Sequence, residues 1–258
     1  MKCIVCGGQH LRQVDYFFLD KLKEIYEKEY AFDVSSYISR DLALLQCVGC
    51  GVQIWDPLVE SPKELYEALS QQSWYYPDGK WEYDLCANWP KIGEKVLEVG
   101  CGAGHFRNRQ QGTYTGLEFN PKVVDNEFIF SETIELHSQR RAQYYDWAFS
   151  FQVLEHAADP RGFLQGLRGS VKRGGHIVLG LPNDDSYLGR AKYFGLNLPP
   201  HHLTRWSVRS VVYLAQLFDL KLSAIHFSPY DPSAYQTKFV KDIDTTKGDL
   251  MVVDFIVA

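Results

Sequence analysis

The stretch KVLEVGCGAGHF, residues 95–106, decides how this chain folds. Lys95 to Val99 reads as a buried strand, because its residues are mostly apolar and β-branched. Closely spaced glycines follow at once, and they let a ligand touch the backbone at the carboxyl end of a sheet. The stretch therefore predicts a ligand-binding turn directly after a strand.

The spacing of these glycines does not fit a dinucleotide site. NAD and FAD sites carry G-x-G-x-x-G, which would put the third glycine at position 105, where this chain has His105. Glu98 stands two residues before the first glycine. A carboxylate there disfavours a pyrophosphate and suits a ligand with an ammonium and a sulfonium group. Charge therefore favours S-adenosylmethionine as the ligand.

A second acid, Glu118, supports the same ligand. It lies twenty residues after Glu98, at the end of a predicted strand over residues 114–119. An acid there can accept hydrogen bonds from both ribose hydroxyls, as in other nucleoside-binding α/β sheets. The alternative is a tight packing turn with two surface acids.

Predicted strands alternate with helices along the rest of the chain. Further strands are expected at residues 133–137, 146–151, 176–181, 220–227 and 249–257. Asp159 and Ser207 read as helix caps, and Gly174 is expected to end the helix that follows Asp159. This alternation predicts an open α/β sheet.

Two matching cysteine pairs stand in the N-terminal region. Each pair reads C-x-x-C-G, and the four residues are Cys3, Cys6, Cys47 and Cys50. Four thiolates suit tetrahedral zinc, and a site with no open position is structural rather than catalytic. Redox cysteines and ordinary buried thiols are the alternatives.

The chain divides by composition into three predicted parts. We expect a zinc-binding module over residues 1–60, a helical and aromatic lid or linker over 61–93, and a cofactor-binding domain over 94–258. Ser61 and Pro62 read as a helix start. Aromatic residues follow, with Tyr76 as the best candidate for substrate contact. Such a cluster either walls an acceptor site or forms core between two domains.

The overall charge of the chain indicates which classes of binding partner are disfavoured. The 258 residues carry a formal net charge of -5, which disfavours nucleic acid as a substrate. There is no apolar run long enough to cross a bilayer, and the N-terminus has no signal-peptide core. We therefore expect a cytoplasmic protein without disulfides.

From Lys95 to Ala258 the chain resembles the class I S-adenosylmethionine-dependent methyltransferases. The likeness rests on VLEVGCGAGHF, on Glu118, and on the segments YDWAFSFQVLEHAADP and KRGGHIVLGLPN. It implies an α/β fold with a Rossmann-like seven-stranded sheet, here preceded by a small zinc-knuckle module. The cysteine pairs and a Pro-His-His loop resemble the subgroup that methylates sugars, sugar nucleotides and other small metabolites.

The resemblance also implies which residues contact the cofactor. The methionine end would meet Glu98, Gly100, Gly102 and Gln152, and ribose and adenine would meet Glu118 and Phe119. Cys101 and Gly104 complete the glycine loop, with Cys101 as a small packing residue. Ser138 stands where the family often has an acid near adenine. The chain departs from the family in having about nine residues, His105 to Thr113, for the helix between the first two strands.

Histidines are the candidates for catalysis. A hydroxyl or carbon acceptor needs a base, and the imidazole pKa lies near neutral. His201 and His202 follow the fifth predicted strand, so their loop is expected at the carboxyl edge of the sheet. The resemblance favours His202 as the base, assisted by His201. Alternatively they cap the helix at Ser207 or pack under Trp206. His156 is a weaker candidate for substrate contact, because it alternatively orients the loop after the fourth strand.

These observations predict an enzyme that methylates a small molecule, namely a sugar, a sugar nucleotide or a secondary metabolite. A second hypothesis is an RNA methyltransferase that uses the zinc module to contact RNA. A third is a catalytically inactive scaffold that binds the cofactor. The sequence names neither the acceptor, nor the atom that is methylated, nor the oligomeric state.

Overall fold

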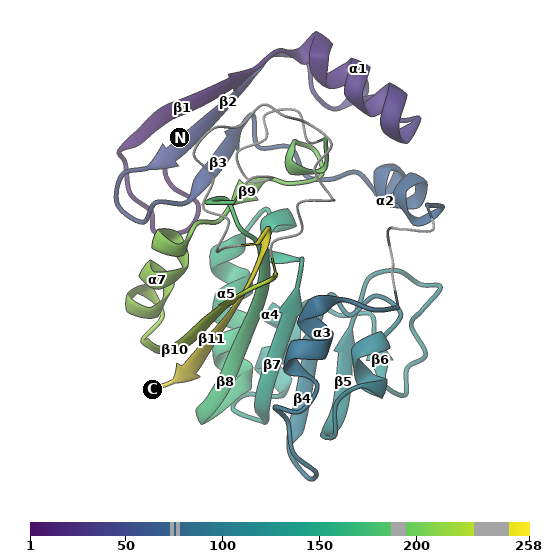
Figure 1. Ribbon diagram of the computed structural model, residues 1–258, viewed down its shortest axis with the longest axis vertical. Helices are drawn as coiled ribbons and strands as arrows, with labels where there is room; N and C mark the ends of the chain where they lie inside the picture. The colour runs from purple at the N-terminus through teal and green to yellow at the C-terminus, as the bar shows by residue number, and fades with distance from the viewer. Residues whose placement is uncertain (73–74, 76–77, 187–194, 230–247) are drawn as a thin grey trace.

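A computed structural model describes residues 1–72, 75, 78–186, 195–229 and 248–258. Within these residues the strands form two sheets, one in the order β1-β2-β3-β9 and one in the order β10-β11-β8-β7-β4-β5-β6. Figure 1 shows the four-stranded sheet and helix α1 above the seven-stranded sheet. The predicted seven-stranded α/β fold is therefore confirmed.

The seven-stranded sheet is parallel except at one side. Its strands are β4 (Lys95–Val99), β5 (Thr113–Leu117), β6 (Ile129–Phe130), β7 (Tyr145–Phe151), β8 (Val171–Pro182), β10 (Leu220–Phe227) and β11 (Leu250–Val257). Only β11 runs antiparallel to its neighbours β8 and β10. The chain passes from β4 to β5 on one side and later to β7 on the other. The strand order thus reverses next to β4, and ligands of such sheets bind at the carboxyl ends there.

Alternate residues of β4 face two different layers, because side chains alternate across a strand. Leu97 and Val99 pack in the core with helices α4 (Ile134–Arg140) and α5 (Pro160–Ser170). Val96 belongs to the core on the other face, beneath helix α3 (Trp81–Cys86). Glu98 alternates with Leu97 and Val99 and therefore shares the α3 face. Figure 1 shows α3 in front of the sheet.

The N-terminal sheet incorporates a strand from the second half of the chain. It contains β1 (Leu11–Phe17), β2 (Leu42–Cys47), β3 (Gln53–Asp56) and β9 (Thr204–Arg205). Gln53 pairs with Arg205 and Ile54 with Thr204. The other α-helices in the described residues are α1 (Leu19–Tyr30), α2 (Lys63–Ser70) and α7 (Val208–Leu217). The segment that follows β8 is therefore tied to the N-terminal strands.

Three local predictions are wrong. Residues 133–137 are not a strand: Thr133 caps α4 by accepting a hydrogen bond from Leu136 N, and the third parallel strand is β6. Helix α5 ends at Ser170 rather than at Gly174, because β8 already begins at the next residue. Ser61 does not cap α2, since its hydroxyl donates to the carbonyls of Pro200 and His201. The predicted caps Asp159 and Ser207 are both present.

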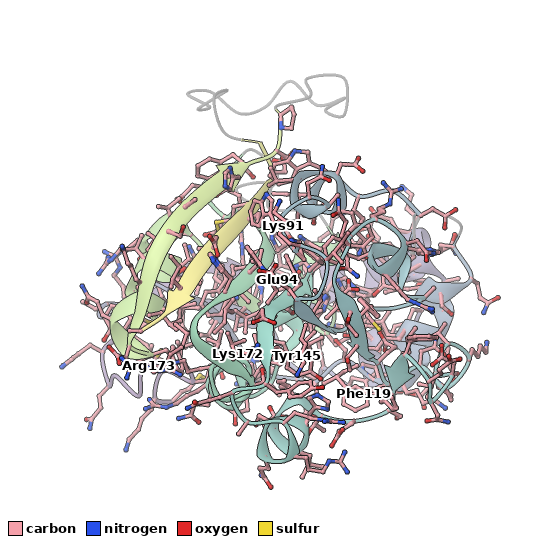
Figure 2. The ribbon with its side chains drawn as sticks, turned by 90° about the horizontal axis from the view of Figure 1, so that it is seen from below. Lys91, Glu94, Phe119, Tyr145, Lys172 and Arg173 are labelled. Atoms are coloured by element: carbon pink, nitrogen blue, oxygen red, sulfur yellow. The ribbon has the colours of Figure 1, made fainter. Side chains whose placement is uncertain are left out.

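The amino edge of the large sheet carries side-chain hydrogen bonds and an ion pair. Figure 2 views this edge and labels Glu94, Tyr145 and Lys172. Glu94 accepts a hydrogen bond of 2.9 Å from Trp147 Nε1, and Lys172 Nζ lies 2.5 Å from Asp146 Oδ1. None of the described helices has the length and apolar character needed to cross a membrane.

Candidate functional site

The glycine loop turns back over the end of β5. Its first residue, Gly100, has φ +73, and a Cβ added there would lie 2.3 Å from Val153 Cγ2. Only glycine fits such a position without strain. The amides of Gly100 and Cys101 both donate to Leu117 O, at 2.8 and 3.1 Å. Cys101 is buried, and its sulfur packs against Gly116, which agrees with its predicted packing role.

Glu118 fixes the glycine loop to the end of β5. Its Oε2 accepts from Gly102 N at 2.8 Å, and its Oε1 accepts from Phe119 N at 2.7 Å and Asn120 N at 3.0 Å. A carboxylate offers about four lone-pair positions, so it can still accept from hydroxyl groups. Phe119 beside it is 66% exposed. Both residues therefore stand at the edge of the sheet where the prediction placed ribose and adenine.

Glu98 is a buried acid rather than an open surface carboxylate. It is 1% exposed, and its Oε2 accepts a hydrogen bond of 2.5 Å from Tyr114 Oη. Burial raises the pKa of Glu98 to about 8, although the Tyr114 hydroxyl and the Lys80 ammonium favour the ionised form. Glu98 therefore holds its proton near neutral pH in the unliganded protein. Sequence reasoning missed Tyr114 as its partner, although Tyr114 is the first residue of the predicted second strand.

Gln152 adopts a strained backbone conformation directly after β7. Its φ is +59, in the left-handed region that residues other than glycine seldom adopt outside functional sites. Its Nε2 donates to Glu82 Oε1 at 3.0 Å, and Glu82 is buried on α3. Sequence reasoning gave Glu82 no role, because an acid in the first turn of a short helix ordinarily faces solvent. The contact brings α3 over the carboxyl end of the sheet.

Ser138 does not lie at the carboxyl edge. It is part of α4, and its hydroxyl donates to Glu135 O at 3.0 Å. It also lies next to Gly169, where α5 ends just before the amino end of β8. The predicted position of Ser138 after a third strand is therefore wrong, for the same reason that the strand itself was misplaced.

The structure brings together three histidines that are far apart in the sequence. His156 lies in the short 3-10 helix Leu154–His156, directly after β7, and His201 and His202 lie in the loop before β9. Their ring centroids are 4.5 to 4.7 Å apart. One ring nitrogen of each lies within 4.8 Å of the others. Neither His201 nor His202 caps α7, whose capping box is formed by Ser207 and Ser210. Tyr76 lies outside the described residues.

Each of these rings is fixed by a hydrogen bond at Nδ1. The partners are His201 O for His156 at 2.6 Å, Leu196 O for His201 at 2.9 Å, and Asn197 Oδ1 for His202 at 3.1 Å. An acceptor oxygen requires that Nδ1 carry the proton, so the lone pair of each ring is on Nε2. Burial lowers the pKa of all three imidazoles, that of His156 to about 4. The rings are therefore neutral near pH 7.

Glu155 lies beside this cluster. It is 1% exposed, and neither carboxylate oxygen has a hydrogen-bond partner among the described residues. Its Oε1 is 3.9 Å from His156 Nε2 and 4.0 Å from His202 Nε2. Burial raises the pKa of Glu155 to about 8. The sequence alone favours a structural role for Glu155 as well as for His156, because nothing in it shows that the loop before β9 returns to this pair.

The cluster and the glycine loop share one edge of the sheet. The glycine loop follows β4 and Glu155 follows β7, and these two strands are parallel neighbours, so both groups lie at the carboxyl ends of adjacent strands. The backbone contacts agree, because Leu203 N donates to Glu155 O at 2.8 Å. The loop before β9 is thereby held against the end of β7. His156 contributes to this through its bond to His201 O, so it holds the loop before β9 rather than the loop after the fourth predicted strand, which was the alternative role weighed for it.

The four N-terminal cysteines form a compact group. Their four sulfur atoms all lie within 4.8 Å of one another. The Sγ atoms of Cys3 and Cys50 are 3.6 Å apart, and those of Cys6 and Cys47 are 3.5 Å apart. A tetrahedral zinc ion with Zn–S bonds of 2.3 Å separates its sulfurs by about 3.8 Å. The donor set and its spacing therefore fit zinc.

Comparison with known proteins gives a family match over most of the chain. Residues 64–225 match the family described as "Methyltransferase domain". The ubiquinone biosynthesis O-methyltransferases of Salmonella arizonae and Salmonella typhi are 34% identical over 107 residues, which are 36% of this chain and 44% of each relative. The match thus spans less than half the length of these curated relatives.

Two solved structures are similar to part of this chain. The 4+2 cyclase SpnF is 13% identical, with a TM-score of 0.51 over 68% of this chain and 80% of its own. A SAM-dependent methyltransferase from Archaeoglobus fulgidus is 14% identical, with a TM-score of 0.49 over 64% of this chain and 87% of its own. The likeness to the cyclase shows a common fold and nothing about the reaction.

Proposed function

Because this chain belongs to the class I methyltransferase family, we propose that it transfers the methyl group of S-adenosylmethionine to a small molecule. The glycine loop carries the proposal. It lies where the strand order reverses, it is fixed by Glu118, and its first glycine has no room for a side chain. A ligand can therefore approach the backbone closely at this point.

In this proposal the residues around the loop bind and orient the cofactor. Glu118 already accepts three backbone hydrogen bonds, so about one of its four lone-pair positions is left for a ribose hydroxyl, and exposed Phe119 offers an apolar face to adenine. Glu98 becomes a carboxylate when a cationic group lies against it, since opposite charge favours the ionised form. When bound, the sulfonium supplies a methyl carbon that is already activated, so accurate positioning by the chain provides much of the acceleration.

We propose a sugar, a sugar nucleotide or a secondary metabolite as the acceptor. Similarity to proteins named for ubiquinone biosynthesis supports a small molecule. The net charge of -5 disfavours a nucleic acid, whose phosphate backbone is negatively charged. The histidine cluster of His156, His201 and His202 lies at the same edge as the glycine loop. It is the set of groups that we expect to activate an acceptor hydroxyl.

The proposal includes a structural zinc ion held by Cys3, Cys6, Cys47 and Cys50. Its support is the sulfur spacing given above and the way in which the protein holds both knuckles. Arg161 Nη1 donates to Val5 O at 3.3 Å, and Arg209 Nη2 donates to Val48 O at 2.6 Å. These contacts orient the two turns without using any thiol.

Calorimetric titration with S-adenosylmethionine and S-adenosylhomocysteine tests the cofactor part of the proposal. We expect saturable binding by the wild type and binding weakened at least tenfold in Glu98→Gln, because a charge-assisted contact is worth about 1.5–3 kcal/mol. Glu94→Gln is the matched control: it neutralises an acid directly before the amino end of β4 and is expected to leave affinity unchanged. The absence of binding at millimolar cofactor would contradict the proposal. A screen of sugar nucleotides for methylated product then tests the acceptor.

A further inference from the structure

No hydrogen bond from the described residues compensates for the burial of the Glu155 carboxyl group. A buried carboxyl group without partners is costly. Here the neighbouring groups are the Nε2 atoms of His156 and His202, which present lone pairs rather than protons. The separations of 3.9 and 4.0 Å are too long for one proton to bridge carboxylate and imidazole directly. A cation placed between the two Nε2 lone pairs and Glu155 Oε1 would be attracted by all three atoms.

We propose that Glu155, His156 and His202 bind a divalent transition-metal cation, such as Zn²⁺, with His201 available as a fourth ligand. The inference deepens the proposed function, on which its catalytic meaning rests. It describes a second metal site, separate from the four cysteines and of different donor chemistry.

The spacing of the donor atoms is close to that of a metal site. Tetrahedral zinc with bonds of 2.0–2.1 Å to nitrogen and oxygen separates its ligand atoms by about 3.4 Å. The observed distances from Glu155 Oε1 to the two Nε2 atoms are 3.9 and 4.0 Å. Each would shorten by about 0.6 Å on metal binding, which small side-chain rotations achieve.

The contacts behind the ligands have the form found in metal sites. A metal-binding histidine usually donates its other N–H to a carbonyl or carboxylate oxygen, which fixes the tautomer and the ring orientation. All three histidines meet this condition through His201 O, Leu196 O and Asn197 Oδ1. His201 Nε2 lies 3.1 Å from Tyr75 Oη, so its lone pair is engaged there until it turns to a metal.

The donor set narrows the class of metal. Imidazole nitrogen suits zinc, copper, iron and nickel, whereas magnesium and calcium prefer an all-oxygen shell. While His201 stays bonded to Tyr75, the other three protein ligands leave a coordination position open, as in catalytic zinc sites. A small cavity, about the size of one water molecule, is lined by Glu155, Asn197 and His202 among others and borders these ligands.

A cation here would act on the acceptor. A bound metal lowers the pKa of an oxygen that it coordinates, so a hydroxyl could lose its proton without a strong base. In this arrangement the lone pair of His202 is committed to the metal. His202 then serves as a ligand, in place of the general-base role predicted from the sequence.

Metal stoichiometry tests the proposal directly. Purified protein is saturated with Zn²⁺, dialysed against metal-free buffer and analysed by inductively coupled plasma mass spectrometry. We expect two zinc ions per wild-type chain and one per chain of Glu155→Gln, which keeps the volume of the side chain and removes its charge. His226→Asn, on β10, is the matched control and is expected to keep two. A single ion in the wild type, or two in Glu155→Gln, would overturn the proposal.

Two further measurements guard against a variant that fails to fold. Asn197→Ala leaves every ligand in place and removes the acceptor for His202 Nδ1, so zinc affinity at the second site is expected to fall about 10- to 100-fold. In wild-type protein, a second equivalent of Co²⁺ is expected to add ligand-field bands without further thiolate-to-cobalt charge transfer. If neither effect is seen, the site is not a metal site. Titration of the same samples with S-adenosylmethionine separates this failure from a failure of the proposed function.

Discussion

At the scale of single residues, the glycine loop makes a prediction that separates strain from steric clash. Gly100→Ala places a Cβ 2.3 Å from Val153 Cγ2 at a φ of +73. Positive φ costs about 1–2 kcal/mol for alanine and overpacking about 1–3 kcal/mol. We expect the free energy of unfolding to fall by about 2–5 kcal/mol and cofactor affinity to fall at least tenfold. Urea unfolding and calorimetry measure the two effects.

Gly174→Ala is the control for that experiment. Its φ is +77, nearly the same as at Gly100, but nothing lies within 4 Å of an added Cβ. It should therefore lose only the cost of the backbone conformation and should keep cofactor affinity. Equal effects of the two substitutions would mean that the contact with Val153 has no part in shaping the loop.

Glu98 links cofactor binding to pH. Its pKa is raised from 4.5 to about 8 in the folded protein, so between these values the folded state keeps a proton that the unfolded state has released. The contribution of Glu98 to the free energy of unfolding therefore falls as pH rises through this window and levels off above it. A cationic ligand reverses the shift and expels the proton.

We accordingly expect S-adenosylmethionine binding at pH 7 to release a proton from Glu98. Calorimetric titration in two buffers with different ionisation enthalpies measures the release. Glu98→Gln should abolish that part of the buffer dependence, because the amide has no proton to give up in this range. Identical proton release by the variant would show that another group titrates.

At the scale of elements, the two cysteine knuckles depend on metal and the parallel strands do not. Removal of zinc by a chelator should expose the amides of residues 3–8 and 47–51 to hydrogen exchange, since the bonds to the metal that hold the two knuckles together are lost. The amides of β4 and β7 should stay protected, because their hydrogen bonds lie inside the large sheet. Full protection of both knuckles in metal-free protein would contradict the structural role of zinc.

Elements with a strong local signal could be predicted, and those set by distant contacts could not. β4 matches its predicted bounds because an apolar run meets glycines, and α7 begins at Val208 because Ser207 caps it. The third strand was misplaced because Thr133, a β-branched residue typical of strands, here caps α4. β6 has only two residues, too few for any periodicity.

The candidate site divides in the same way. The glycine loop and Glu118 could be predicted because they follow directly from strand ends. The contact between Gln152 and Glu82 joins residues seventy positions apart, and that between His156 and His201 joins residues forty-five apart. No local pattern encodes such pairs, which arise only when the loops pack over the sheet.

At the scale of the whole molecule, the predicted division at residues 60 and 93 stays a prediction, and the core runs across it. Cys3, Cys47 and Ile54 belong to the same buried cluster as Leu97 and Trp206. Helix α3, from the middle part, covers the opposite face of the large sheet through Tyr83, whose ring centroid lies 5.4 Å from that of Phe151. The three parts therefore share packing, whatever their separate origins in the sequence.

The pairing of β3 with β9 has a consequence for the growing chain on the ribosome. Gln53 emerges about 150 residues before its partner Arg205, an interval of roughly 8–30 s at about 5–20 residues per second. During that wait the outer side of β3 is an unpaired strand edge, open to association with other nascent chains. The synthesis of β9 therefore sets the moment at which this edge of β3 is covered.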